Sequence, residues 1–267
     1  MLAPRDLFDL DGLSLAGLFE GVDLVWEVLD RIKDYTAELV KKAGGTSVRL
    51  RMHGRMVGRT VVIHQGRVHD SDFQLLGGDP TKGQMRVRLE GRELTDAAVV
   101  YAGAVLMDDD IHLAPGCKVE PGALIYGPSF IGPGSEVRQG AYLRGGCLIG
   151  AGCVVGHTTE VKNSVMLDGA KAGHFAYLGD SVLGREVNLG AGTKLANLKI
   201  IERPYRIKAG DQSYTIKRRK FGAILGDRVE TGCNSVTNPG TILGPRSLVA
   251  PCVSVPGGFH PPKSVLR

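Results

Sequence analysis

An aliphatic residue returns at every sixth position between residues 113 and 167, and this period constrains the fold more than any other feature of the chain. The series is Leu113, Val119, Ile125, Ile131, Val137, Leu143, Ile149, Val155, Val161 and Leu167. A small or slim residue follows four places after nearly every member: Cys117, Ala123, Ser129, Ser135, Ala141, Cys147, Cys153, Thr159 and Val165. A period of six fits neither the α-helix nor a simple strand alternation, but it fits a short strand and a corner repeated around a solenoid. Each unit cannot bury its apolar side alone, so neighbouring coils must stack. We therefore predict an all-β chain built around a parallel β-helix.

The repeat slips after residue 167 and is later interrupted. It continues by single-residue slips at Leu183, Leu189 and Leu195, stops over residues 199–222, and resumes at Leu225. Two short β-like runs flank Gly210 in the interruption, which predicts a hairpin thrown out from one corner. Long excursions from a regular stack are usually functional. We predict a β-helix over residues 105–255 with this hairpin inserted, and a tail over residues 256–267 that ends the stack.

The first hundred residues do not carry the repeat. Apolar residues from Leu18 to Leu39 recur at three- or four-residue steps, which predicts an amphipathic helix within residues 1–45 that ends near Gly44. This helix is expected to pack on an open end or side of the solenoid, or at a subunit contact. Residues 46–104 predict a small β-rich segment with strands near 48–52, 61–63 and 85–89. Its histidines have no partners at metal-ligand spacing, so no metal site is predicted there: His53, His64 and His69.

Composition narrows the class of protein. The 38 glycines follow no triplet period, which excludes collagen. The formal charge is only +5, and the basic residues concentrate at 217–220, which favours a local anion site over a nucleic-acid surface. No apolar run of about 18 residues and no signal pattern occurs, so we expect a cytoplasmic protein without a membrane partner. Cys117, Cys147 and Cys153 occupy the small inward position of the repeat, which predicts buried free thiols.

Two runs are more specific than the hexapeptide period. These are Lys171-Ala172-Gly173-His174 with Tyr177-Leu178-Gly179-Asp180, and Asn188-Leu189-Gly190-Ala191-Gly192-Thr193. With their surroundings, from about residue 131 to 253, they resemble the C-terminal acetyltransferase half of the bifunctional bacterial enzyme that makes UDP-N-acetylglucosamine. They also resemble the archaeal sugar-1-phosphate nucleotidylyltransferases with acetyltransferase tails. The resemblance implies a left-handed β-helix, acetyl-CoA as cosubstrate, and a homotrimer with active sites between subunits.

The resemblance also implies roles for individual residues. His174 matches the catalytic base; it stands at an outward position of its coil, and an imidazole titrates near neutral pH. Residues matching the acceptor site are Arg144, Lys162, Tyr177, Asn188 and Asn197. Residues matching the coenzyme A groove are Ala191, Lys220 and Cys233. Independently of the family, Arg144 and Lys162 stand where the repeat prefers a small residue, and cations there suit a phosphate.

The predicted function is acetyl-CoA-dependent N-acetylation of a small molecule, an amino-sugar phosphate or nucleotide sugar resembling glucosamine 1-phosphate. Nothing in residues 1–100 resembles a nucleotide-binding loop, so no nucleotidyl transfer is expected. Cys233 replaces a family serine and the hairpin at 199–222 is long, so the acceptor can differ from glucosamine 1-phosphate. Two alternatives stay open: a non-catalytic scaffold or sugar-nucleotide-binding protein, and a zinc enzyme of the γ-carbonic-anhydrase kind. The zinc enzyme requires three converging histidines, of which the repeat supplies His157 and His174.

Overall fold

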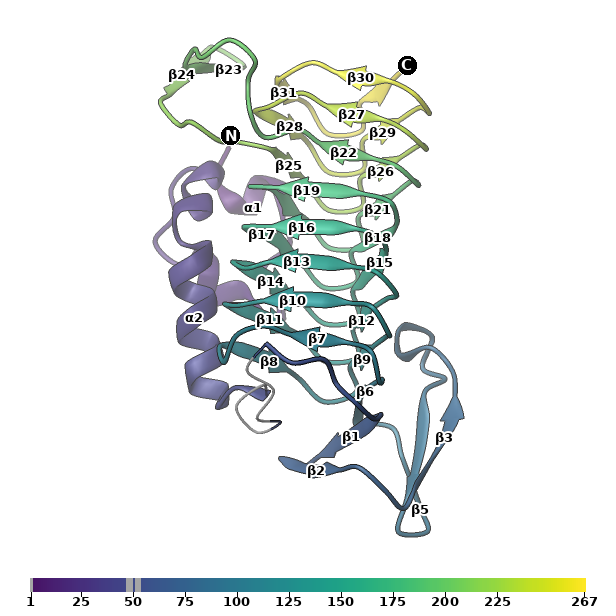
Figure 1. The fold of residues 1–267 in the computed structure, drawn as a ribbon. Helices are drawn as coiled ribbons and strands as arrows, with labels where there is room; N and C mark the ends of the chain where they lie inside the picture. The colour runs from purple at the N-terminus through teal and green to yellow at the C-terminus, as the bar shows by residue number, and fades with distance from the viewer. Residues whose placement is uncertain (1, 47–49, 51–53) are drawn as a thin grey trace.

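The computed structural model describes residues 2–46, 50 and 54–267. Its core is a left-handed parallel β-helix of about nine turns, as predicted (Figure 1). Each turn contributes one strand to each of three parallel sheets, so the coil has three flat faces and three corners. Stacking along the sheets supplies the backbone hydrogen bonds that a single short strand cannot make.

The strands of the three faces follow one another along the chain. The first sheet contains β7 (Val105–Leu106), β10 (Leu124–Tyr126), β13 (Tyr142–Arg144), β16 (Glu160–Lys162), β19 (Tyr177–Gly179), β22 (Lys194–Leu195), β27 (Val236–Thr237) and β30 (Ser254–Val255). The second contains β8 (Ile111–Leu113), β11 (Ser129–Ile131), β14 (Cys147–Ile149), β17 (Ser164–Met166), β20 (Val182–Leu183), β25 (Ala223–Leu225), β28 (Thr241–Leu243) and β31 (Gly258–His260). The third contains β2 (Arg67–His69), β1 (Val61–His64), β6 (Ala98–Val100), β9 (Lys118–Val119), β12 (Glu136–Val137), β15 (Val154–His157), β18 (Lys171–His174), β21 (Asn188–Leu189), β26 (Glu230–Thr231), β29 (Leu248–Val249) and β32 (Val265–Leu266). All neighbours are parallel except at β1, which pairs antiparallel with β2 and β6.

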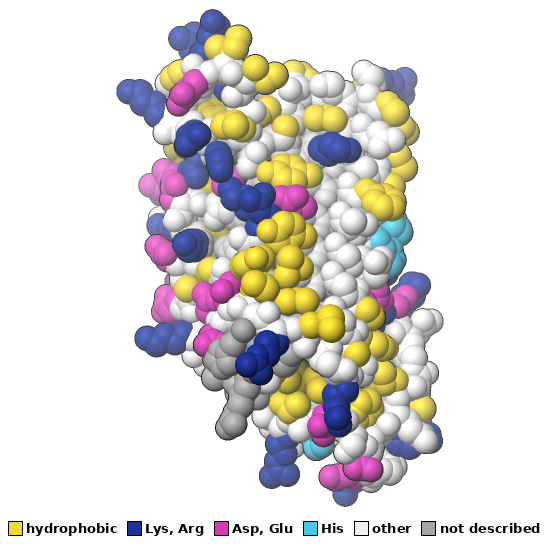
Figure 2. Space-filling view, viewed as in Figure 1, with side chains coloured by type: hydrophobic (Ala, Val, Ile, Leu, Met, Phe, Trp, Pro, Cys, Tyr) yellow, Lys and Arg dark blue, Asp and Glu magenta, His cyan; other side chains and the backbone are white. Residues whose placement is uncertain are grey.

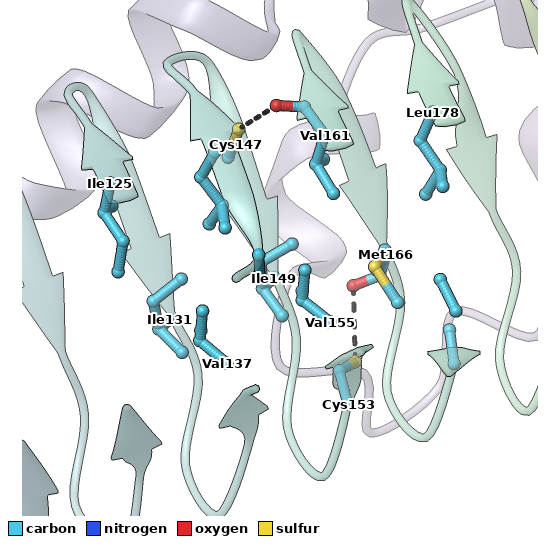
Figure 3. Close-up of a cluster of buried hydrophobic side chains, with 14 of the residues drawn as sticks. Ile125, Ile131, Val137, Cys147, Ile149, Cys153, Val155, Val161, Met166 and Leu178 are labelled. Atoms are coloured by element: carbon cyan, nitrogen blue, oxygen red, sulfur yellow. Dashed lines mark hydrogen bonds between the residues drawn. The ribbon is translucent and has the colours of Figure 1, made fainter. Parts of the chain in front are cut away.

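The sixfold series fills the interior, with one correction. Every predicted aliphatic residue from Leu113 to Val161 is buried in one continuous core (Figure 3). The slip then comes earlier than predicted, because Met166, not Leu167, pairs with Ile149 and points inward. Leu167 belongs instead to the apolar cluster outside the coil. The series continues inside through Ala172, Leu178, Leu183, Leu189 and Leu195.

The three predicted inward cysteines are buried thiols. Cys117, Cys147 and Cys153 have no exposed surface, and burial raises the pKa of each to about 12. Cys147 Sγ donates to the carbonyl of Val161 at 3.3 Å, and Cys153 Sγ to that of Met166 at 3.8 Å (Figure 3). These cysteines therefore act as small apolar residues of the core.

The N-terminal segment covers the outer face of the second sheet, along the side of the solenoid (Figure 1). It contains α1 (Pro4–Leu7), the 3₁₀ helices η1 (Ala16–Phe19) and η2 (Val25–Asp30), and α2 (Ile32–Ala43). The single helix predicted from Leu18 was wrong: two 3₁₀ turns precede α2, because the chain bends at Gly21, where φ is +64°. The predicted end at Gly44 is correct, since this residue caps α2 in the left-handed conformation. No described helix is long and apolar enough to cross a membrane.

Two excursions leave the coil. Near the first turns, β3 (Phe73–Gly77), β4 (Arg86–Leu89) and β5 (Arg92–Leu94) form a small antiparallel sheet, with the 3₁₀ helix η3 (Pro80–Lys82) between β3 and β4. The strand predicted near 48–52 and His53 lie outside the described residues, apart from residue 50. Near the last turns, β23 (Tyr205–Ala209) and β24 (Gln212–Ile216) form a hairpin with its turn at Gly210 (Figure 1).

The end of the chain differs from the predicted tail. Residues 258–260 form β31 beside β28, and residues 265–266 form β32 beside β29. The coil therefore continues beyond residue 255, and the prolines of this region occupy its corners instead of ending it.

Candidate functional site

A cluster of polar side chains lies where three strands of the first sheet end. Lys162 ends β16, and its ammonium lies 3.6 Å from Asp180, which directly follows β19. Lys220 lies near Lys162, whose side-chain hydrogen bond and then whose like charge lower the pKa of Lys220. Two cations held together are unfavourable unless an anion is shared between them. We name Arg144, Lys162, Tyr177, Asp180, Asn197 and Lys220 the cation cluster.

Asp180 organises the buried side of this cluster. Its carboxylate accepts hydrogen bonds from the amides of Asn163 at 2.9 Å and Asn197 at 2.5 Å. Asn163 and Asp180 both have positive φ, 44° and 47°, and stack in register at one corner. Asp180 is only 6 % exposed, so its charge is balanced by Lys162 and by these donors rather than by solvent.

Tyr177 reaches this corner from the start of β19. A Cβ placed on Gly179 would lie 2.6 Å from both the Tyr177 hydroxyl and the Asn197 amide nitrogen. The two groups therefore converge above Gly179, and only glycine leaves room for them. Burial first, and then Glu160, raise the pKa of the Tyr177 hydroxyl, which keeps it protonated and able to donate a hydrogen bond.

Arg144 is the outermost cation of the cluster. It ends β13, is exposed, and pairs with Glu160 at 2.7 Å. Its guanidinium lies 5.8 Å from the ring centre of Tyr142. The Glu160 hydrogen bond raises the pKa of Arg144, so the group is always charged. Because Glu160 already accepts a hydrogen bond from the Arg144 guanidinium, an incoming phosphate must share that guanidinium with the Glu160 carboxylate.

His174 lies at the other edge of the first sheet. It ends β18 before the corner that leads into β19, and its exposed ring stacks on His157 with centroids 5.6 Å apart. Phe175 follows with 60 % exposure and its ring 6.3 Å from that of His174. Within the described chain no hydrogen bond, ion pair or ring contact joins His174 to the cation cluster.

The remaining predicted residues fall on different corners. The carbonyl of His174 accepts from Gly192 N at 2.9 Å, and that of Ala191 accepts from Asn234 N at 2.8 Å. Ala191 and Cys233 therefore lie on the corner of His174, one and two coils further on. Lys220, predicted with them, lies instead at the cation cluster. Asn188 joins neither group: it is exposed on the third sheet, in register with Lys171.

Figure 2 shows the two edges on one face of the molecule. Histidine side chains lie at the right-hand edge, beside β15 and β18, and basic side chains gather at the left. The strands of the first sheet separate these two edges. They are at most three residues long in the described chain, so the distance between the edges is about 10 Å at the usual rise per residue.

Sequence reasoning missed the acidic and amide partners of these cations. Asp180, Asn163 and Glu160 are now seen to orient Lys162, Asn197 and Arg144. Spacing carried a usable signal: Asn163 and Asp180 are 17 residues apart, the length of the slipped coil, so both occupy one corner. His157 and His174 are separated by the same distance and stack for the same reason.

No three His, Cys, Asp or Glu side chains among the described residues are placed to hold a metal ion. His64 lies 3.4 Å from Asp96. His69, on β2, contributes to the edge of the third sheet.

Comparisons with known proteins agree with this solenoid. Residues 125–256 match the family described as GMPPB C-terminal domain. A "Bifunctional sugar-1-phosphate nucleotidylyltransferase/acetyltransferase" of Sulfurisphaera tokodaii is 39 % identical over 97 residues, covering 36 % of this chain and 24 % of the relative. "Bifunctional protein GlmU" of Stutzerimonas stutzeri is 33 % identical over 169 residues, covering 59 % of this chain and 34 % of the relative. The protein of the same name from Methanococcus vannielii is 35 % identical over 96 residues, covering 36 % of this chain and 23 % of the relative.

A solved Arabidopsis UDP-N-acetylglucosamine acyltransferase also matches, at 14 % identity and a TM-score of 0.27, over 61 % of this chain and 70 % of that one; this likeness is too distant to bear on function. The chain spans between about a quarter and a third of the length of the curated relatives above. Over residues 125–256 the solenoid of this chain is thus similar to the GMPPB C-terminal domain, and it is homologous to regions of GlmU and of the archaeal sugar-1-phosphate nucleotidylyltransferase/acetyltransferases.

Proposed function

We propose that this protein is an acyl-CoA-dependent N-acyltransferase that acetylates an amino-sugar phosphate or an amino-sugar nucleotide. The observation that carries the proposal is the set of cations around buried Asp180: Lys162 lies 3.6 Å from its carboxylate, and Lys220 lies near Lys162. Asp180 balances only one of the two lysine charges, and a phosphate dianion supplies further negative charge. The acetyltransferase named in the relatives supports acyl transfer as the reaction.

The cation cluster binds the acceptor in this proposal. Lys162 and Lys220 hold the phosphate, and Arg144 shares it with Glu160. The Tyr177 hydroxyl and the Asn197 amide, which converge above Gly179, donate to the sugar. A group held by several fixed donors keeps its amine in one orientation, which is the main requirement for attack on a thioester.

His174 is the proposed general base. The acceptor nitrogen forms a bond to the acetyl carbon of acetyl-CoA while the carbon–sulfur bond breaks. His174 takes a proton from the attacking amine, and this proton can pass to the departing thiolate, so free coenzyme A is released. Ala191 and Cys233 continue the corner beyond His174, and we propose that the pantetheine of the donor follows this corner.

The two halves of this site lie at opposite edges of the first sheet. We therefore propose a homotrimer in which His174 of one subunit faces the cation cluster of its neighbour, as the resemblance to the acetyltransferase family implies. Asn188, isolated on the third sheet, is free in this arrangement to complete a neighbour's site. We further propose that the enzyme works in the cytoplasm, where acetyl-CoA and sugar nucleotides are available.

The proposal is tested by following thiol release from acetyl-CoA against a panel of amino sugars, their 1-phosphates and their UDP derivatives. We expect release with a phosphorylated amino sugar and none with the unphosphorylated sugar. His174→Ala should lower the rate by roughly 10²-fold or more, the usual contribution of a general base, while the melting temperature stays unchanged. His69→Ala, outside the site, is the matched control. If thiol release is undiminished in His174→Ala, the base is another residue. If the wild type releases no thiol with any acceptor of the panel, acyl transfer to amino sugars is rejected.

A further inference from the structure

An open hollow of about 650 Å³ lies between the hairpin and the last coils. Its lining is mainly apolar and includes Leu198, Ile200, Ile201, Tyr205, Ile207 and Pro239, with the backbone of Gly240, Gly257 and Gly258. The volume is within the range of small-molecule sites. No residue of the predicted acceptor or donor site lines it.

Three large apolar side chains of this lining are exposed to solvent. Leu198 is 51 % exposed, Ile201 is 64 % exposed and Ile200 is fully exposed. They lie within a run of four residues, and all three line the same hollow. A contiguous apolar surface of this kind marks a binding site more often than chance exposure does.

The hollow borders the cation cluster. Leu198 forms an antiparallel backbone bridge with Lys220, and the carbonyl of Asn197 accepts from Phe221 N at 2.9 Å. Ala196 and Leu198, the two chain neighbours of Asn197, both line the hollow. The hollow therefore lies next to the backbone that carries Asn197 and Lys220.

Tyr205 lies between the two parts. It is 3 % exposed, and its ring centre lies 5.3 Å from that of Phe221, the residue that directly follows Lys220 in the chain. Tyr205 also lines the hollow. It therefore connects the hollow with the backbone beside Lys220.

The rim of the hollow is basic. Lys199 lies 3.9 Å above the Tyr205 ring, and the exposed Arg206 lines the same hollow. Arg203 and Arg219 line a smaller adjoining hollow of about 190 Å³. Among the described residues, Glu202 is the only acidic one that lines either hollow, so the combined surface selects an anion that also carries an apolar or aromatic part.

We propose that the hollow is a nucleoside subsite, so that hollow and cation cluster together bind a nucleoside diphosphate. The base and ribose occupy the apolar lining while the diphosphate reaches Lys162 and Lys220. This inference rests on the phosphate role given to these lysines in the proposed function. It deepens that function by naming the place where the nucleoside part of a substrate binds.

A nucleoside fits the hollow better than an acyl chain or a second copy of the protein does. An acyl chain needs an enclosed apolar tunnel, whereas this hollow is open and has a rim of cations. A second copy would have to present an acidic surface, and the protein is basic overall, with a charge of +5. Bases bind against apolar and guanidinium surfaces, and the exposed isoleucines and Arg206 of the hollow supply both.

The test measures binding of UDP, ADP and inorganic pyrophosphate by calorimetry to the full-length protein. Both nucleotides should bind at least about tenfold more tightly than pyrophosphate, the scale of one stacked base. The double variant Leu198→Ser/Ile201→Ser should lose this advantage and keep its affinity for pyrophosphate. Leu76→Ser, at an apolar residue of β3 that is 43 % exposed, is the control and should behave as wild type.

Equal affinity for pyrophosphate and the nucleotides would overturn the inference, as would a nucleotide advantage that survives in the double variant. A smaller oligomer in the double variant, with an unchanged affinity ratio, would overturn it in favour of a second copy in the hollow. Competition between coenzyme A and UDP would assign the subsite to the acyl donor, and simultaneous binding would assign it to the acceptor. Because binding is the readout, failure of acetyl transfer in the wild type leaves this result standing.

Discussion

Gly156 shows how closely adjacent coils are stacked beside the candidate base. A Cβ at this position would lie 1.8 Å from the carbonyl oxygen of Gly173 on the next coil, which is backbone that cannot move aside. Gly173 faces open space, with nothing within 4 Å of its own Cβ position. The two glycines precede His157 and His174, so their spacing sets how the two rings stack.

We predict that Gly156→Ala strongly destabilises the protein and that Gly173→Ala does not. The first forces two strands of the third sheet apart, at an expected loss of about 1–3 kcal/mol or more, as for other overpacked sites. The second places a methyl group in open space. Urea unfolding of both variants makes the comparison, and equal stability of the two would mean that the coils are less closely stacked than described.

Ion pairs, largely buried, connect the small sheet of β3, β4 and β5 to the coil. Lys118, with its side chain only 8 % exposed, contacts Asp79 at 2.8 Å, Glu120 at 3.1 Å and fully buried Glu136 at 3.8 Å. Arg138 pairs with Glu136 at 2.9 Å. Hydrogen bonds from Lys118 and then Lys82 lower the pKa of Asp79 to about 2.

This network predicts how acid stability depends on Asp79. Because the folded-state pKa is lowered, its stabilising contribution is fully present above the usual value of 3.8 and is lost as pH falls through about 2. Between pH 5 and pH 2 the wild type should therefore lose up to about 2 kcal/mol more stability than Asp79→Asn. Asp211→Asn, on the exposed hairpin turn, is the control. Parallel acid curves for wild type and Asp79→Asn would show that the network does not hold the excursion.

The elements were predictable where a period was strict. Hexapeptide spacing predicted the coil because the inward aliphatic residues are the core itself. It could not separate 3₁₀ from α-helical turns before Ile32, since both bring residues three or four apart onto one face. It also missed the last coil, because Gly258 and the nearby prolines read as a terminator although they occupy corners.

The candidate site was predictable as a set of residues but not as an arrangement. The motif identified His174 and Lys162, yet the position of a side chain around the coil depends on slips such as the one before Met166. Lys220, which follows the hairpin, joins Lys162 across the coil end for this reason. Nor could the sequence show that strands of the first sheet keep His174 apart from the cations.

The whole molecule presents half of the proposed site at each edge of one face, and we propose that two subunits complete it. The most direct test coexpresses His174→Ala and Lys162→Ala subunits with different tags and assays purified mixed oligomers for acetyl-CoA-dependent thiol release. In a mixed trimer one intact pair of edges meets, so about a third of wild-type activity should return although each parent is nearly inactive. Mixed oligomers no more active than their parents would contradict a site shared between subunits.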